Sequence, residues 1–243
     1  MTVLVGRDLR AEVGDGARLG LPVALGYIPI GIAFGLVAKE AHLDLWATAG
    51  MSALVFAGAG QLMAVHLLVQ GTAPWIIVLL TYFINLRHMV MGATLAHRQT
   101  CRSPLLRGLL AFFLTDETYA VAQFAPGELT FARQLALGVV AYGGWVGGSV
   151  LGYLLGAVFP PDLEASFGIA LYAMFLGLLV PNLRGAREPL LLTLLAMFLS
   201  AGLHAVFPRL PGGVAVVVSA LLAALPAPLL GMGQDRAEEE VGS

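Results

Sequence analysis

The sequence has 243 residues, of which 58% are hydrophobic and 12% charged, with a mean hydropathy of +0.86 and a formal net charge of −2. An ordinary soluble domain is about a quarter charged, so this composition excludes a water-soluble globular protein. The sequence has no basic block that could neutralise a phosphate backbone, which excludes nucleic-acid binding, and its single cysteine, Cys101, excludes an internal disulfide or a multi-thiolate metal site.

The apolar stretches predict an all-α fold, a polytopic bundle of transmembrane helices. A helix needs about 20 apolar residues to cross the bilayer, so the chain is long enough for about seven or eight crossings. The stretches are continuous rather than alternating, which favours helices over the strands of a barrel. In chain order the predicted helices are Leu19–Ala38, Leu45–Val69, Pro74–Ala96, Leu105–Phe124, Phe131–Phe159, Leu163–Val180, Leu190–Phe207 and Gly213–Leu230.

Charged residues flank this bundle and bear on its orientation. Residues 1–18 are expected to be a cytoplasmic segment before an uncleaved first span, residues 19–231 the transport domain, and residues 232–243 an acidic, solvent-exposed tail. Three predicted spans separate the N-terminal arginines from Arg98–Arg107, and three more separate that loop from Arg184 and Arg187. These basic clusters therefore cannot all be cytoplasmic unless one stretch is broken or re-entrant, or the positive-inside rule is violated once.

A weak internal repeat relates residues 23–62 to residues 140–179 without gaps. Its identical positions include Gly26, Gly31, Gly35 and Gly60, which match Gly143, Gly148, Gly152 and Gly177. Chance alone would give some of these matches in a sequence so rich in Gly, Ala and Leu. Paired halves are common in secondary transporters, and an odd number of spans per half would make the repeat inverted.

Glycines recur at every fourth position in two of the predicted helices. They are Gly31 and Gly35 in the first, and Gly144, Gly148, Gly152 and Gly156 in the fifth. Such a row lies along one face of a helix and lets another backbone come close. The pattern predicts tight helix packing, with a sliding or gating interface as the alternative.

Residues that weaken a helix occur at bilayer depth in the first two stretches. Pro29, followed by Gly31, removes a backbone hydrogen bond and frees a carbonyl. Gly58 and Gly60 precede a buried amide, Gln61, in the second stretch. Unwound backbone at this depth is tolerated only where protein or a wet cavity covers it. The residues predict substrate-facing breaks or, alternatively, a simple proline kink with Gln61 bonded to a neighbouring helix.

The third stretch is interrupted by Asn85-Leu86-Arg87-His88. An arginine at the bilayer centre costs from about 2.5 to over 10 kcal/mol, so Arg87 is expected to face a partner or water. Asn85 and His88 are three residues apart and share a helix face. In the alternative interpretation, Arg87 ends a short helix and extends to the lipid interface.

Two adjacent acids, Asp116 and Glu117, lie within the fourth stretch. Adjacent helical residues point about 100° apart, so at most one lines a given cavity while the other can pair with Arg87. A medium of low dielectric favours the protonated carboxyl group, which would let an acid here carry a proton. The alternative is an interfacial hairpin with both acids in water. His66 and His204 are expected to be hydrogen-bonded core histidines.

Motifs of other functional classes are absent from the sequence. It contains no HExxH or HxxxH pair, no phosphate-binding Gly-Lys motif and no GxSxG elbow. The sequence therefore predicts no metal site, no cofactor and no enzyme activity. A non-transporting membrane scaffold is one alternative, and an intramembrane enzyme that depends on Ser52 or on Asp116 alone is the other.

Four ordered motifs in the first half resemble the AzlC-type family, the larger subunit of bacterial branched-chain amino acid exporters linked to azaleucine resistance. The first motif, Pro-x-Gly-x-x-Phe-Gly, is matched by Pro29, Gly31, Phe34 and Gly35. The others are matched by residues 56–61 (FAGAGQ), 85–88 (NLRH) and 115–117 (TDE). The second half resembles the family mainly in hydropathy and spacing.

The resemblance implies proton-coupled export of valine, leucine, isoleucine or related amino acids across a bacterial inner membrane, with a small AzlD-type membrane partner. In this interpretation free amides at half-helix N-termini hold the substrate carboxylate. The expected substrate-binding residues are Pro29, Gly31, Gly58, Gly60, Gln61, Asn85 and Arg87. The expected proton-coupling residues are His88, Asp116 and Glu117, with Glu117 as an alternative partner of Arg87.

Overall fold

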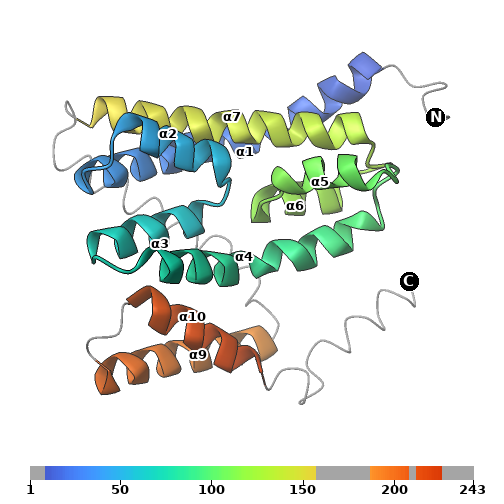
Figure 1. Cartoon of the computed structure of the whole chain (residues 1–243). Helices are drawn as coiled ribbons and strands as arrows, with labels where there is room; N and C mark the ends of the chain where they lie inside the picture. The colour runs from blue at the N-terminus through green and yellow to red at the C-terminus, as the bar shows by residue number, and fades with distance from the viewer. Residues whose placement is uncertain (1–8, 157–186, 208–211, 226–243) are drawn as a thin grey trace. The chain divides into compact units, whose positions relative to one another are not determined.

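The computed structural model describes residues 9–156, 187–207 and 212–225, and these are helical apart from short connections and one isolated bridge between Gln99 and Leu129 (Figure 1). The all-α prediction is confirmed for this part of the chain. Three of its helices are long and apolar enough to cross a membrane. They are α1 (Leu9–Glu40), α4 (Pro74–Ala96) and α7 (Phe131–Leu155).

The remaining helices are shorter, and several follow the predicted stretches closely. They are α2 (Leu45–Leu54), α3 (Gly58–Val69), α5 (Pro104–Phe112), α6 (Asp116–Phe124), α9 (Arg187–Val206) and α10 (Gly212–Ala224). The α4 helix has its predicted bounds, whereas α1 begins ten residues earlier than predicted. The predicted helix Leu163–Val180 and the acidic tail lie outside the described residues.

The chain divides into two compact units, residues 1–66 with 84–171 and residues 67–83 with 172–243. The first contains α1, α2, most of α3, the second half of α4, and α5 to α7. In the second, α9 and α10 pack against each other. The residues discussed below as a candidate site all belong to the first unit.

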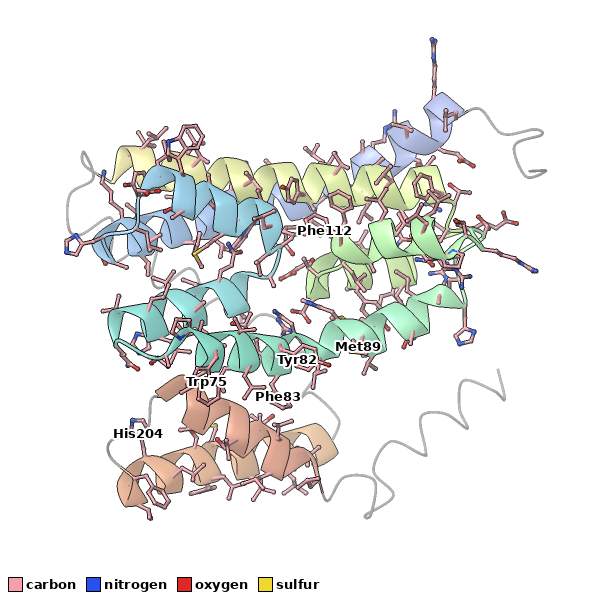
Figure 2. The ribbon with its side chains drawn as sticks, in the orientation of Figure 1. Trp75, Tyr82, Phe83, Met89, Phe112 and His204 are labelled. Atoms are coloured by element: carbon pink, nitrogen blue, oxygen red, sulfur yellow. The ribbon has the colours of Figure 1, made fainter. Side chains whose placement is uncertain are left out.

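Large apolar side chains face outward along α4. Trp75, Tyr82 and Met89 are 68%, 57% and 65% exposed, and they extend away from the helix axis (Figure 2). Water-soluble proteins seldom expose a row of large apolar side chains, whereas a lipid-facing helix surface is expected to do so. The two histidines expected in the core, His66 and His204, are exposed instead.

The helices α1 and α7 run in the same direction and pack along a row of glycines. Gly16 lies against Arg133 near one end, and Gly35 lies against Ser149 near the other. An added Cβ at Gly35 would lie 2.1 Å from the carbonyl oxygen of Ser149. The glycine rows therefore serve the tight packing that their spacing predicts.

The packing of α1 on α7 bears on the predicted repeat. Gly31 lies against Gly148 and Gly35 against Gly152, the same pairs that the repeat alignment matches. An inverted repeat would place such counterparts on antiparallel helices, whereas these two are parallel. The repeat itself is not confirmed, because its second part extends beyond the described residues.

The second predicted span, Leu45–Val69, is a pair of short helices that folds back on itself. The side-chain amide of Gln61 donates a hydrogen bond of 3.2 Å to the Ser52 hydroxyl. In one continuous helix these residues would be about 13 Å apart along the axis. The chain therefore reverses at residues 55–57, and α3 runs in the opposite direction to α2 (Figure 1). We call this pair hairpin 1.

The fourth predicted span, Leu105–Phe124, is likewise a hairpin formed by α5 and α6, here called hairpin 2. Arg98 donates hydrogen bonds to backbone carbonyls at the end of α6 and just beyond it, and Arg107 in α5 donates to the carbonyl of Ala96. The start of α5 and the end of α6 therefore lie together, and the chain reverses at residues 113–115 (Figure 1). Each helix is about 13 Å long, far less than a 30 Å hydrocarbon core.

The two hairpins start from opposite ends of α1. Hairpin 1 begins at Leu45, a short turn after α1 ends, whereas the base of hairpin 2 lies at the N-terminal ends of α1 and α7. There Thr130 donates to Glu12, Arg133 pairs with Asp15 at 3.1 Å, and Gln99 donates to Gln134. The prediction that both stretches are single spans is therefore wrong, and the predicted total of seven or eight crossings is not confirmed.

The hairpins also resolve the conflict between the first two basic clusters. Two long helices, α1 and α4, lie between the N-terminal arginines and the loop Arg98–Arg107, rather than the three spans predicted. The two clusters therefore lie at the same end of the first unit, as the positive-inside rule requires of cytoplasmic loops. The structure therefore favours the alternative of a broken stretch, and two stretches are broken rather than one.

Candidate functional site

The tips of the two hairpins, residues 55–57 and 113–115, meet beside two tyrosines halfway along α1 and α7. The Tyr27 ring packs edge-on against Phe56 of hairpin 1 with centroids 5.9 Å apart, and its hydroxyl lies 2.6 Å from the Thr115 hydroxyl of hairpin 2. The Tyr142 ring packs edge-on against Phe56 at 5.4 Å and against Phe113 at 5.6 Å. Each tyrosine thus contacts both hairpins.

Hairpin 1 is held on α7 by a closed ring of buried hydrogen bonds. The Trp145 indole donates to Gln61, Gln61 donates to Ser52, Ser52 donates to Ser149, and Ser149 donates to the carbonyl of Trp145. The three polar side chains are at most 1% exposed. Gln61 is therefore bonded to a neighbouring helix, which is the simpler of its two predicted roles.

The acids at the start of α6 point to different partners. Asp116 Oδ2 lies 2.9 Å from Arg87 Nη1, and Glu117 accepts a hydrogen bond from the Tyr27 hydroxyl. The prediction that one acid would pair with Arg87 is confirmed. The specific alternative of a pair between Arg87 and Glu117 is wrong, because the two acids diverge at the first turn of α6 and Asp116 faces α4.

The acids lie at a helix start that was not predicted. Thr115 caps α6, since its hydroxyl accepts from the Thr118 amide while the Thr118 hydroxyl accepts from the Thr115 amide. The alternative of an interfacial hairpin is right in shape but wrong in position, because this tip reaches Tyr27 at mid-length of α1. Asp116 is 29% exposed.

The start of α3 differs from that of α6 in having no acidic residue in its first turn. The first amides of any helix have no partner within the helix, and they carry the positive end of its dipole. Gly58 brings this turn against Trp145, because an added Cβ would lie 2.6 Å from the indole ring. Among the described residues, the amides of Gly58, Ala59 and Gly60 therefore have no hydrogen-bond partner, and they lie close to the hairpin tips.

The other predicted residues have less direct links to the tips. Pro29 lies inside α1, which is continuous, so the predicted break in the first span is wrong and the proline-kink alternative fits better. Gly31 packs against α7. Asn85 Oδ1 is buried and has no hydrogen-bond partner among the described residues.

The interrupted sequence of α4 does not end the helix, which continues from Arg87 to Ala96. The alternative in which Arg87 ends a short helix is therefore wrong. His88 is partly buried on the same helix and lies within electrostatic range of Arg87 and Asp116. The α4 helix and the tip of hairpin 2 thus bring together three of the predicted site residues, Arg87, His88 and Asp116.

Sequence reasoning did not identify the aromatic residues that connect the tips. Tyr142 and Trp145 lie in an apolar stretch with no unusual spacing, and Tyr27 is one more ring two residues before Pro29. The sequence does, however, contain a signal for the helix start at the tip of hairpin 2. A threonine followed by two acids and a second threonine is typical of a helix N-terminus.

Comparison with known proteins supports the resemblance seen in the motifs. The model of the AzlC protein family matches residues 22–159, more than half of the chain. The chain belongs to the AzlC family. The match begins within α1 and extends past the end of α7, and it therefore contains both hairpins and the two tyrosines.

Relatives in this family are also membrane proteins. An uncharacterized membrane protein of Archaeoglobus fulgidus is 33% identical over 172 residues, which cover 70% of this chain and 75% of that protein. The inner membrane protein YgaZ of Escherichia coli is 29% identical over 176 residues, covering 69% and 72%. No solved structure matches the chain. The chain is a membrane protein of a family consistent with a role in transport.

Proposed function

We propose that this chain is the larger subunit of a secondary transporter that exports branched-chain or related hydrophobic amino acids in exchange for protons. The observation that carries the proposal is the meeting of two re-entrant hairpins at mid-length of α1 and α7. Irregular backbone at this depth costs several kcal/mol per unpaired group unless it serves a cavity or packs in protein. Discontinuous helices of this kind form the substrate sites of many transporters.

The substrate carboxylate binds at the first turn of α3 in this proposal. The free amides of Gly58, Ala59 and Gly60 attract an anion, as helix N-termini generally do. The rings of Phe56, Tyr142 and Trp145 line the same region and suit an apolar side chain. Gln61, Pro29 and Gly31 shape this region by holding the helices together rather than by direct contact with the substrate.

The proton is carried at the tip of hairpin 2. Glu117, Asp116 and His88 are the titratable groups there, and Arg87 balances the charge of Asp116 at 2.9 Å. Among the described residues, Asp116 is paired with an arginine and Glu117 is not, so a proton can bind Glu117 without breaking an ion pair. Asn85 and Arg87, two residues apart on α4, line the path of the substrate in this proposal.

Transport by purified protein tests this proposal. Proteoliposomes containing the chain, alone and with a small AzlD-type partner, are expected to move radiolabelled leucine or valine faster when an inward proton gradient is imposed. Empty liposomes and lysine, which is charged and polar, serve as controls. Equal release of preloaded leucine and lysine, or no gradient-dependent release with either assembly, would contradict the proposal.

The orientation follows from the clusters at the base of hairpin 2. We place Arg10, Arg18 and the loop Arg98–Arg107 in the cytoplasm, in agreement with the positive-inside rule. The free thiol of Cys101 lies in this loop and is partly exposed. A membrane-impermeant maleimide is therefore expected to label Cys101 in inverted vesicles but not in intact cells. Labelling of intact cells would reverse the orientation, and a Cys101→Ser variant provides the background.

A further inference from the structure

The two hairpins are attached to the long helices in different ways. Hairpin 1 is joined to α7 by the closed ring of neutral hydrogen bonds through Gln61, Ser52 and Ser149, and none of those groups changes its charge near neutral pH. The tip of hairpin 2 is joined to α1 through the Tyr27 hydroxyl, and one partner of that hydroxyl is a carboxyl group. Only the second attachment can respond directly to a proton.

The direction of each hydrogen bond at the Tyr27 hydroxyl follows from the number of hydrogens available. Its phenol has a single hydrogen, which is donated to Glu117 Oε2. The contact of 2.6 Å between the oxygens of Tyr27 and Thr115 must then use the hydrogen of Thr115. Thr115 therefore donates to Tyr27, and Tyr27 donates to Glu117. The tyrosine links the cap of α6 to the acid in its first turn.

We propose that Tyr27 is a positioning residue that couples protonation of Glu117 to release of the hairpin 2 tip from α1. When Glu117 is charged, it accepts a charge-assisted hydrogen bond, which is roughly twice as strong as a neutral one. A proton from solution binds to the carboxylate and removes that charge, while Tyr27 keeps its own hydrogen. The weakened contact then lets the tip leave α1 while hairpin 1 stays on α7. The use of this motion for export rests on the proposed function.

Other charged and titratable groups near Glu117 are consistent with this role. Asp116 is on the same helix and is paired with Arg87 of α4, while His88 lies beside that pair. The α7 helix contributes Tyr142, whose hydroxyl is engaged elsewhere, donating to the carbonyl of Ala53 at 3.0 Å. Among the described residues, the hydrogen bond of Glu117 to α1 therefore comes from the Tyr27 hydroxyl, and no ion pair joins Glu117 to a cation.

Tyr142 provides a matched control for Tyr27. Both rings pack against Phe56, and each hydroxyl makes hydrogen bonds, but that of Tyr142 bonds to hairpin 1 and that of Tyr27 to hairpin 2. Tyr27→Phe and Tyr142→Phe each remove one hydroxyl and keep the ring. The two variants therefore separate loss of the proton-sensitive contact from general loss of packing.

Hydrogen exchange and flux together test the inference. For the wild type in lipid nanodiscs, exchange of residues 111–119, corrected for intrinsic rates, is expected to be faster at acidic than at alkaline pH by about tenfold, the effect of weakening one charge-assisted bond. Residues 53–61 of hairpin 1 should show no such ratio. In Tyr27→Phe, residues 111–119 should exchange rapidly at both pH values, and leucine flux should no longer depend on pH. In Tyr142→Phe, both the exchange of residues 111–119 and the leucine flux should depend on pH as in the wild type.

Glu117→Gln is a second variant that mimics the protonated acid. It is expected to exchange rapidly in residues 111–119 at both pH values, which keeps the inference testable if Tyr27→Phe does not fold. A wild-type pH ratio in either variant, or equal pH ratios in both hairpins, would overturn the inference. If exchange behaves as expected but no hydrophobic amino acid is transported, the proposed function fails while the role of Tyr27 stands.

Discussion

Neutralising Arg87 alone is expected to lower both the stability of the protein and its transport, and neutralising Asp116 with it should recover the stability. Arg87→Gln leaves the Asp116 carboxylate without its cation at mid-membrane, and Asp116→Asn leaves the guanidinium without its anion. Because the Arg87 side chain is 41% exposed, we expect a loss of about 1 kcal/mol for each single variant, a fivefold change in folded ratio. The double variant should lie close to the wild type in stability.

Thermal unfolding followed by size-exclusion chromatography measures the three variants, and proteoliposome flux measures their transport. We expect the flux of each single variant to fall by about tenfold, because the charge that remains resists movement of the tip. The double variant should not regain full flux, since Arg87 also lines the proposed path. Strictly additive losses of stability would show that the two side chains do not act as a pair.

Gly152→Ala is expected to be the most damaging single-methyl change in α7. An added Cβ at Gly152 would lie 2.1 Å from the carbonyl oxygen of Ile32, which belongs to rigid helix backbone. Overpacking of this kind costs about 1–3 kcal/mol, because α1 and α7 must separate to make room. Their separation would also displace both tyrosines, so we expect transport to fall together with the unfolding temperature.

Gly147→Ala is the matched control on the same helix. An added Cβ at Gly147 has nothing within 4 Å, and alanine favours helix over glycine by roughly 0.5–1 kcal/mol. Its unfolding temperature should therefore equal or exceed that of the wild type. If both variants behave alike, the close approach of α1 to α7 is not needed for stability.

The long helices could be predicted from the sequence because composition alone specifies them. The bounds of α4 were predicted correctly, since an apolar run starts at Pro74, a favoured first residue of a helix, and polar residues follow Ala96. The break before Gly58 was also expected from the glycines near it. These features depend only on neighbouring residues.

The folding back of the two broken stretches could not be predicted in the same way. A break in an apolar run does not say whether the chain continues across the bilayer or turns back. That choice depends on contacts between residues far apart in the sequence, such as those of Arg98 with the end of α6. The same is true of Tyr27, whose importance comes from a partner on α6 rather than from its own surroundings in the sequence.

The candidate site was predicted in its charged part and missed in its aromatic part. An unpaired charge within the bilayer has a high free-energy cost, so the pairing of Arg87 with one of the two acids could be predicted from that cost. Tyrosine and tryptophan are common in membrane helices for several reasons, and their presence predicts no particular contact. The ring through Trp145 and Gln61 therefore became visible only in the structure.

Because hairpins 1 and 2 start from opposite ends of α1, a water-soluble molecule on one side of the membrane can reach the base of only one of them. An antibody fragment raised against the loops around Arg98 and Gly127 would act from the side where α1 begins, whereas one against the turn at His42 would act from the side where α1 ends. Uptake and release of cargo could thus be blocked separately, each by a reagent that never enters the bilayer.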